Sequence, residues 1–327
     1  MFASGLSGER ALQVLRAALD KEQQQWKPIQ PRPASSIQEI TDMERDKEAY
    51  WLVQQSQTFD FAPETFALAI SVMDRVSTLV KIRPKYLRCV AISCLYIAAK
   101  TLEDDEVIPD TLDLVRKSQC GCSISEVLRM EVVILTKLDW NPKAVTAIDF
   151  LHVIHALLMW RFPHLLTHLK DMTPSRQLAL LTRKLLALLC HADVTRDRPA
   201  VVAMALISLE LEQVTPQHWF TLNQMVQTAI QAENNELITC RERMTWLLSQ
   251  RGLLVTGYQK KSTETPKSKK RKVEETQSDD IYDGIKRLYD ENVTTEKMML
   301  PKRGSCASEL HHDVEDIHPF VQAVAAV

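Results

Sequence analysis

The chain has 327 residues, of which 45% are hydrophobic, so it is long enough to bury the cores of two domains. Its formal net charge of −2 provides no overall electrostatic attraction to nucleic acid or to an anionic membrane. No apolar run approaches the roughly 18 residues of a membrane span, and the N-terminus lacks the basic-then-apolar pattern of a secretory signal. We therefore expect neither a nucleic-acid partner nor a membrane partner.

Glycine is scarce through most of the sequence. Between Arg10 and Arg251 the only glycine is Gly121. Phosphate-binding loops and tight β-hairpin turns both depend on glycine, because it adopts positive φ angles and has no side chain. The sequence therefore predicts a mostly helical body. Several of the seven cysteines lie in apolar stretches, which is typical of reduced thiols packed as small apolar side chains.

Proline marks the starts of the predicted helices, because it is tolerated in the first turn of a helix and destabilises the interior. An amphipathic N-terminal helix is expected at residues 9–26. A first set of five helices is expected at 45–58, 64–80, 85–101, 110–117 and 123–138. A second set of five is expected at 146–160, 174–190, 199–212, 216–232 and 235–249.

The two sets have the character of a repeat. The third helix of each, residues 90–100 and 202–212, is apolar nearly all the way round, which is typical of a helix enclosed by its neighbours. We predict an all-α fold of two tandem five-helix repeats, with an N-terminal helix and a disordered, charged C-terminal tail. The predicted domains are the N-terminal helix and linker, the first repeat, the second repeat and the tail, at 1–44, 45–142, 143–252 and 253–327.

The tail is rich in Lys, Ser, Thr and Glu, and such a composition does not bury enough apolar surface to fold alone. Within it, residues 281–289 carry apolar side chains at helical spacing. This segment is either a short helix that folds on a partner or a transient turn.

Motifs for catalysis or metal binding are not found in the sequence. It contains no phosphate-binding loop, nucleophile elbow, zinc-protease motif or dinucleotide fingerprint. The spacing of Cys120-Gly-Cys122 is wrong for a zinc knuckle. The four acidic residues at 103–106 are interpreted as a solvated loop. We therefore predict that the chain is not an enzyme and that it uses no metal or cofactor.

The two repeats carry different charged residues at two aligned positions, and this difference could be related to function. Aligning the third helices places Lys100 opposite Glu212, and aligning the fifth helices places Glu131 opposite Arg241. Lys100 and Glu131 could form a surface salt bridge, which would contribute at most about 1 kcal/mol. Alternatively, they could flank a groove and hydrogen-bond the backbone of a docked helix. The spacing alone leaves both interpretations open.

A series of short motifs follows the order of a known family. The motifs are Arg45, Trp51-Leu52, Pro63-Glu-Thr-Phe-Ala-Leu-Ala, Met73-Asp-Arg75, Ala98-Ala-Lys100 and Val127-Leu-Arg-Met-Glu131. Across residues 45–249 the chain resembles the two-box cyclin family, and in particular the branch that holds the G and I cyclins. The segments Cys94–Glu106 and Cys120–Glu126 carry the likeness to that branch. The resemblance implies structural roles in the first cyclin box for Arg45, Trp51, Asp74 and Arg75.

The same resemblance implies a function for the first repeat. In cyclins that activate kinases, the residues matched by Lys100 and Glu131 grip the regulatory helix of a cyclin-dependent kinase. Leu135, one turn after Glu131, is expected to add apolar contact, and we assign Glu103 to the same kinase-binding site. The expected function is that of a non-catalytic subunit that binds and activates a cyclin-dependent protein kinase in cell-cycle or post-mitotic signalling.

The sequence is also compatible with two other functions. The first alternative is a cyclin-box adaptor that binds other proteins, such as phosphatase or ubiquitin ligase components, without activating a kinase. The second is a nucleic-acid-associated factor, which would need a basic stripe across the body. The near-neutral charge of the chain counts against the second alternative.

The chain also departs from the family pattern. Kinase-activating cyclins with a substrate-docking patch carry apolar residues where this sequence has Glu44, Lys47 and Glu48. We predict that apolar capture of a substrate peptide is absent or altered here, because each charge would be desolvated without a partner. Thr101 stands where an aromatic residue usually follows the lysine, which removes a large contact with a kinase.

A short basic run in the tail resembles a monopartite nuclear import signal, which importin reads as an extended, accessible segment. Its basic residues are Lys267, Lys269, Lys270, Arg271 and Lys272. The resemblance implies importin as a second partner and a distribution between nucleus and cytoplasm. The alternative interpretation is an ordinary solvated charge run.

Overall fold

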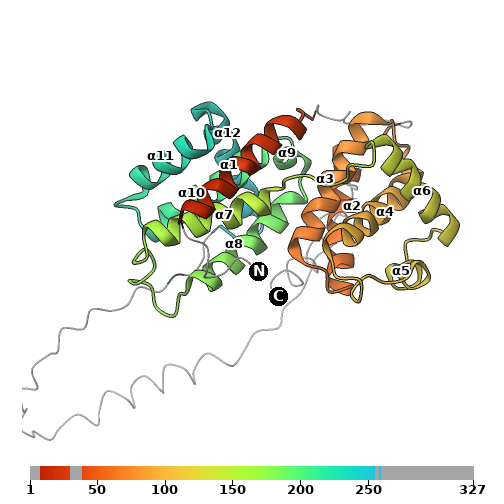
Figure 1. Cartoon of the computed structure of the whole chain (residues 1–327), viewed down its shortest axis with the longest axis horizontal. Coiled ribbons are helices and arrows are strands. Elements are labelled where there is room, and N and C mark those ends of the chain that lie inside the picture. The colour runs from red at the N-terminus through yellow and green to blue at the C-terminus, as the bar shows by residue number, and fades with distance from the viewer. Residues whose placement is uncertain (1–7, 30–38, 255–257, 259–327) are drawn as a thin grey trace, which may run out of the picture. The chain divides into compact units, whose positions relative to one another are not determined.

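The computed structural model describes residues 8–29, 39–254 and 258. Within them the chain forms twelve α-helices (Figure 1). The first six are α1 (Gly8–Gln25), α2 (Asp42–Thr58), α3 (Pro63–Leu79), α4 (Pro84–Leu102), α5 (Thr111–Ser118) and α6 (Ile124–Lys137). The others are α7 (Ala147–Arg161), α8 (Pro174–Leu189), α9 (Ala192–Thr195), α10 (Pro199–Val214), α11 (Trp219–Ile230) and α12 (Asn234–Gln250). The predicted all-α class is confirmed, whereas segment 281–289 lies outside the described residues.

Each half of the fold is built around one enclosed helix. In α4 every residue from Cys89 to Ala99 is buried, and α2, α3 and α6 pack around it. In α10 every residue from Ala200 to Leu211 is buried, and α7, α11 and α12 pack around it. Helices α4 and α10 are the two that the sequence marked as apolar all round, because a helix with neighbours on every side has no face that needs to be polar.

Some helix starts are fixed locally by side-chain caps. Thr41 and Glu44 form a reciprocal capping box at the start of α2, and Ser123 and Glu126 form another at α6. Two predicted starts are three residues off: α2 begins at Asp42 and not at residue 45, and α11 begins at Trp219 and not at residue 216. Thr215 does not cap α11, because the N-cap residue of α11 is His218. Thr215 instead ends α10, where its backbone N–H donates to the Leu211 carbonyl at 2.8 Å.

The N-terminal helix α1 packs against α7, in the second half of the fold. Glu22 near its end is only 3% exposed. Its carboxylate accepts hydrogen bonds from the Arg198 guanidinium at 2.9 Å and from the Ala200 backbone N–H at 2.8 Å. Since Ala200 lies in the first turn of α10, the Glu22 carboxylate caps that helix from a distant part of the chain.

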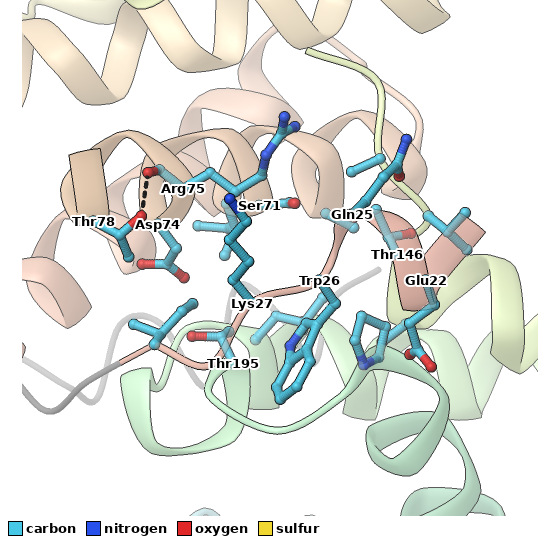
Figure 2. A pocket seen from close by; sticks show the side chains of 18 of the residues that line it. Glu22, Gln25, Trp26, Lys27, Ser71, Asp74, Arg75, Thr78, Thr146 and Thr195 are labelled. Atoms are coloured by element: carbon cyan, nitrogen blue, oxygen red, sulfur yellow. Dashed lines mark hydrogen bonds between the residues drawn. The ribbon is translucent and has the colours of Figure 1, made fainter. Parts of the chain in front are cut away.

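A cavity of about 280 Å³ lies where the end of α1 meets α3, the 138–146 connection and the second half. Trp26 and Lys27 line it from the segment after α1, and Asp74 and Arg75 line it from α3 (Figure 2). Arg75 also holds the connection in place, because its guanidinium donates to the backbone carbonyls of Asn141 and Pro142, both at 2.9 Å. The connection between the halves is therefore anchored to α3.

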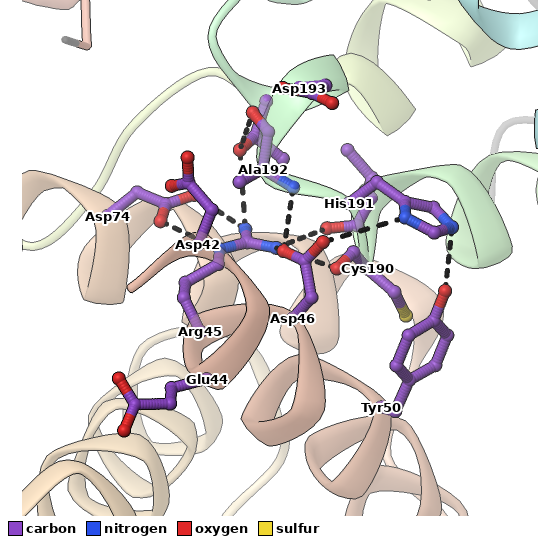
Figure 3. Close-up of polar contacts among 12 residues, drawn as sticks. Asp42, Glu44, Arg45, Asp46, Tyr50, Asp74, Cys190, His191, Ala192 and Asp193 are labelled. Carbon is purple, nitrogen blue, oxygen red and sulfur yellow. Dashed lines mark hydrogen bonds and ion pairs between the residues drawn. The ribbon is translucent and has the colours of Figure 1, made fainter. Parts of the chain in front are cut away.

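Arg45 of α2 joins the two halves (Figure 3). Its side chain is completely buried, and its Nε and Nη2 atoms donate to the two carboxylate oxygens of Asp74 at 3.0 and 2.6 Å. Its Nη1 atom donates to the carbonyls of Leu189 and Cys190, at the end of α8, at 3.3 and 2.9 Å. One guanidinium thus neutralises a buried carboxylate and satisfies two carbonyls of the other half.

No helix in the described part of the chain is long and apolar enough to cross a membrane. Among the same residues, no group of three or more His, Cys, Asp or Glu side chains is placed to hold a metal ion.

Candidate functional site

Lys100 and Glu131 meet on the surface of the first half. Lys100 lies in the last turn of α4, Glu131 lies in the middle of α6, and the Lys100 Nζ atom is 2.7 Å from Glu131 Oε1. The Lys100 ammonium also lies 4.0 Å from the centre of the Tyr96 ring, one turn back along α4. A cation at the C-terminus of a helix is electrostatically favoured. The two predicted site residues are therefore side by side, with Lys100 the more exposed of the two (40% against 12%).

Apolar side chains border this ion pair. Leu128 and Leu135 lie one turn to either side of Glu131 on α6, with Leu128 exposed and Leu135 half-buried. Leu112 is exposed on α5, which packs against α6. We call Lys100, Leu112, Leu128, Glu131 and Leu135 the first-half face. This face offers a hydrogen-bond donor, an acceptor and apolar contact area, which are the groups needed to bind an amphipathic helix.

Glu103 has a structural task that the sequence analysis missed. Its Oε1 atom accepts a hydrogen bond from the Ala62 backbone N–H at 2.8 Å and another from the Thr65 hydroxyl. Helix α3 begins at Ala62-Pro63 without a capping side chain of its own, so Glu103 supplies the cap from the end of α4. The missing local cap at Ala62 was the signal in the sequence. The assignment of Glu103 to kinase binding stays a prediction.

The second half carries an ion pair at the matching place, with the charges exchanged. Arg241 of α12 lies 2.6 Å from Glu212 of α10, and its guanidinium lies 5.0 Å from the centre of the Trp219 ring. Glu212 and Arg241 are the residues that the repeat alignment placed opposite Lys100 and Glu131. The repeats therefore differ in the sign of each charge, and not in whether a pair is present.

Two of the three charged residues on α2 that depart from the family pattern, Glu44 and Glu48, have partners within the chain. The Glu44 carboxylate accepts from the Thr41 backbone N–H at 2.8 Å as part of the capping box. The Glu48 carboxylate lies 2.7 Å from Arg88 Nε, and the Arg88 guanidinium stacks 4.1 Å from the Trp51 ring centre. Burial raises the pKa of Glu48 above its ordinary value, and the nearby Arg88 opposes that rise. The predicted loss of an apolar docking patch stays a prediction.

Thr101, the other departure, is half-buried, and its hydroxyl donates to the Ile97 carbonyl of its own helix at 2.7 Å. Thr101 therefore adds no side chain to the first-half face. The basic run at 267–272 lies outside the described residues.

Comparison with known proteins agrees with the fold. Residues 15–142 match the family model of the cyclin N-terminal domain. Human Cyclin-I2 is 32% identical over 237 residues, which are 72% of this chain and 62% of that protein. Cyclin-G1 of Bos taurus is 36% identical over 168 residues, which are 51% of this chain and 55% of that protein. The chain thus spans less than two thirds of the length of these relatives.

The X-ray structure of a viral cyclin from herpesvirus saimiri superposes with a TM-score of 0.56 at 17% identity, covering 72% of this chain and 99% of that one. This likeness shows the same fold. The family-model match and the sequence relatives show that the chain contains a cyclin N-terminal domain and is similar to the G and I cyclins.

Proposed function

We propose that this chain is a non-catalytic regulatory subunit that binds and activates a cyclin-dependent protein kinase through the first-half face. The observation that carries the proposal is the Lys100–Glu131 pair, 2.7 Å apart, with exposed Leu128 one turn away on α6 and exposed Leu112 on the neighbouring helix α5. The cyclin N-terminal domain and the similarity to the G and I cyclins support it.

The proposed mechanism is conformational selection. A docked kinase helix would place apolar side chains against Leu112, Leu128 and Leu135, while Lys100 donates to a backbone carbonyl and Glu131 accepts from a backbone N–H. The existing ion pair does not oppose docking strongly, because a partly exposed pair contributes about 1 kcal/mol or less. Because the chain would bind the active conformation of the kinase more tightly than the inactive one, binding would increase the population of the active conformation.

The test is co-purification of the full chain with a panel of cyclin-dependent kinases, followed by an activity assay of each captured kinase. Lys100→Ala/Glu131→Ala should abolish both capture and activation. Glu212→Ala/Arg241→Ala is the matched control, because it removes the corresponding ion pair from the second half, and it should behave like the wild type. Full kinase binding by the first double variant would contradict the assignment of the site.

The adaptor function predicts a different outcome of the same experiment. If the wild-type chain captures no kinase, or captures one without raising its activity, the chain is better described as an adaptor.

We also propose that importin recognises the basic run at 267–272 and that the chain is distributed between nucleus and cytoplasm. The sequence alone supports this part of the proposal. Deletion of residues 267–272 in a fluorescently tagged full chain should reduce its nuclear fraction. An unchanged nuclear fraction would remove the import signal from the account.

A further inference from the structure

The second half presents a surface laid out like the first-half face. Phe220 is the second residue of α11, as Leu112 is of α5, and Ile238 stands three residues before Arg241, as Leu128 stands before Glu131. Both apolar side chains are more exposed than their counterparts, at 69% for Phe220 and 54% for Ile238. We call Glu212, Phe220, Ile238 and Arg241 the second-half face.

These four residues are close together in space. The rings of Phe220 and Trp219 have centres 6.4 Å apart, and the Trp219 ring in turn lies 5.0 Å from the Arg241 guanidinium. The Trp219 indole is fixed by a hydrogen bond from its Nε1 to the Ser208 carbonyl at 3.0 Å. Ile238 lies one turn from Arg241 on α12. The apolar groups and the ion pair therefore form one patch on a rigid frame.

The more exposed member of the ion pair on this patch is the anion. In the second-half pair the exposed member is Glu212, at 54%, whereas Arg241 is 18% exposed. In the first-half pair the exposed member is the cation. Glu212 also lies in the last turn of α10, where the helix dipole is negative and disfavours a carboxylate. A cation from outside would be attracted by both the carboxylate and the helix end.

We infer that the second-half face is a docking surface for a basic amphipathic helix of a partner protein, one that carries Lys or Arg beside two apolar side chains. The apolar side chains would cover Phe220 and Ile238, whose exposure otherwise leaves an apolar patch in water. The basic residue would pair with Glu212. This inference goes beyond the kinase proposal and does not depend on it, because the two faces share no residue.

A designed helical peptide of about 18 residues is a suitable probe, with leucines at i and i+4, lysines at i+3 and i+7, and alanines elsewhere. A second peptide with glutamates in place of the lysines is its control. Fluorescence anisotropy with the full chain should show the basic peptide binding about tenfold more tightly than the acidic one. Equal affinity for the two peptides would overturn the inference.

Variants locate the binding. Glu212→Gln should weaken binding of the basic peptide about threefold, and Glu212→Lys about tenfold. Phe220→Ala/Ile238→Ala should weaken both peptides, and because these side chains are exposed the folded state should be retained, as a thermal melt would check. Asp20→Lys, which makes a comparable charge change at an exposed position of α1, should leave affinity unchanged. If Asp20→Lys weakens binding as much as Glu212→Lys, the attraction is non-specific and the inference fails.

Discussion

Arg45 shows how much one buried side chain can carry. Two nitrogens of its guanidinium donate hydrogen bonds to Asp74, which is 2% exposed. The third nitrogen donates to two backbone carbonyls of the second half. Removing the cation of a buried ion pair is costly, because it leaves a buried carboxylate whose charge is no longer compensated by that partner.

Arg45→Ala should therefore lower the free energy of unfolding by about 3–5 kcal/mol. Urea denaturation of the purified chain measures this. Lys47→Ala is the control, because Lys47 is exposed on the same helix, and it should change stability by less than about 0.5 kcal/mol. A loss below about 1 kcal/mol for Arg45→Ala would show that Asp74 finds another partner or becomes protonated.

Lys100 and Glu131 could be selected from the sequence because two repeats were available for comparison, and Leu135 was implied by the family resemblance, whereas Leu112 and Leu128 were not singled out. The same alignment placed Glu212 and Arg241 at the matching positions of the second repeat. Their opposite charges could have predicted an ion pair, but this ion pair was not predicted. The role of Glu103 was harder to predict. It depends on contact with Ala62 and Thr65, which are 41 and 38 residues away, and local sequence patterns carry little information about such contacts.

At the scale of elements, the helix starts were predicted well where a proline marks them, whereas the start of α2 was placed three residues too late despite its capping box. Proline stands in the first turn of α3, α4, α8 and α10, and each of these helices begins within one residue of its predicted start. Helix α9 was missed, because four residues are too few to show a helical period. The start of α11 was placed too early, because Thr215 serves the preceding helix.

The contact of α7 with α8 makes the stability of the second half depend on pH. His155 of α7 is buried, and its Nε2 atom is 3.2 Å from Gln177 Oε1 of α8. Burial lowers the pKa of His155 to about 4, against the partly compensating hydrogen bond with Gln177. The folded state therefore holds His155 neutral where the unfolded state, with a pKa near 6.5, becomes protonated.

Because the pKa of His155 is lower in the folded state than in the unfolded state, its contribution to stability is complete above about pH 6.5. It is lost as the pH falls toward 4. The expected loss is about 3 kcal/mol over this range. Urea denaturation at several pH values measures it, and His155→Gln should make the dependence shallower. An identical pH dependence in wild type and variant would assign the effect to other groups.

At the scale of the whole molecule, polar contacts as well as the shared core hold the N-terminal helix and the two halves together. Arg45 links α2 to the end of α8, Arg75 anchors the connection, and Glu22 links α1 to the start of α10. The sequence predicted an N-terminal helix but not that it would cap α10, because Glu22 and Ala200 are 178 residues apart.

Glu22→Ala should destabilise the chain by about 2–3 kcal/mol, because it leaves Arg198 and the Ala200 N–H without this acceptor. Thermal denaturation measures the effect. Asp20→Ala, an exposed change two residues away, should leave the melting temperature nearly unchanged. Equal effects of the two substitutions would indicate that the α1 contact contributes little to stability.

The two faces differ in their exposed charge: the first half presents a cation beside exposed leucines, and the second presents an anion beside Phe220 and Ile238.

We expect kinase affinity to depend on the residues of the first-half face and not on those of the second-half face. The most direct test is the dissociation constant of the full chain for its co-purified cyclin-dependent kinase, measured by calorimetry. Lys100→Ala/Glu131→Ala should weaken this affinity at least about tenfold, whereas Glu212→Ala/Arg241→Ala should leave it unchanged. An affinity unaffected by the first double variant, or lost with the second, would contradict the account.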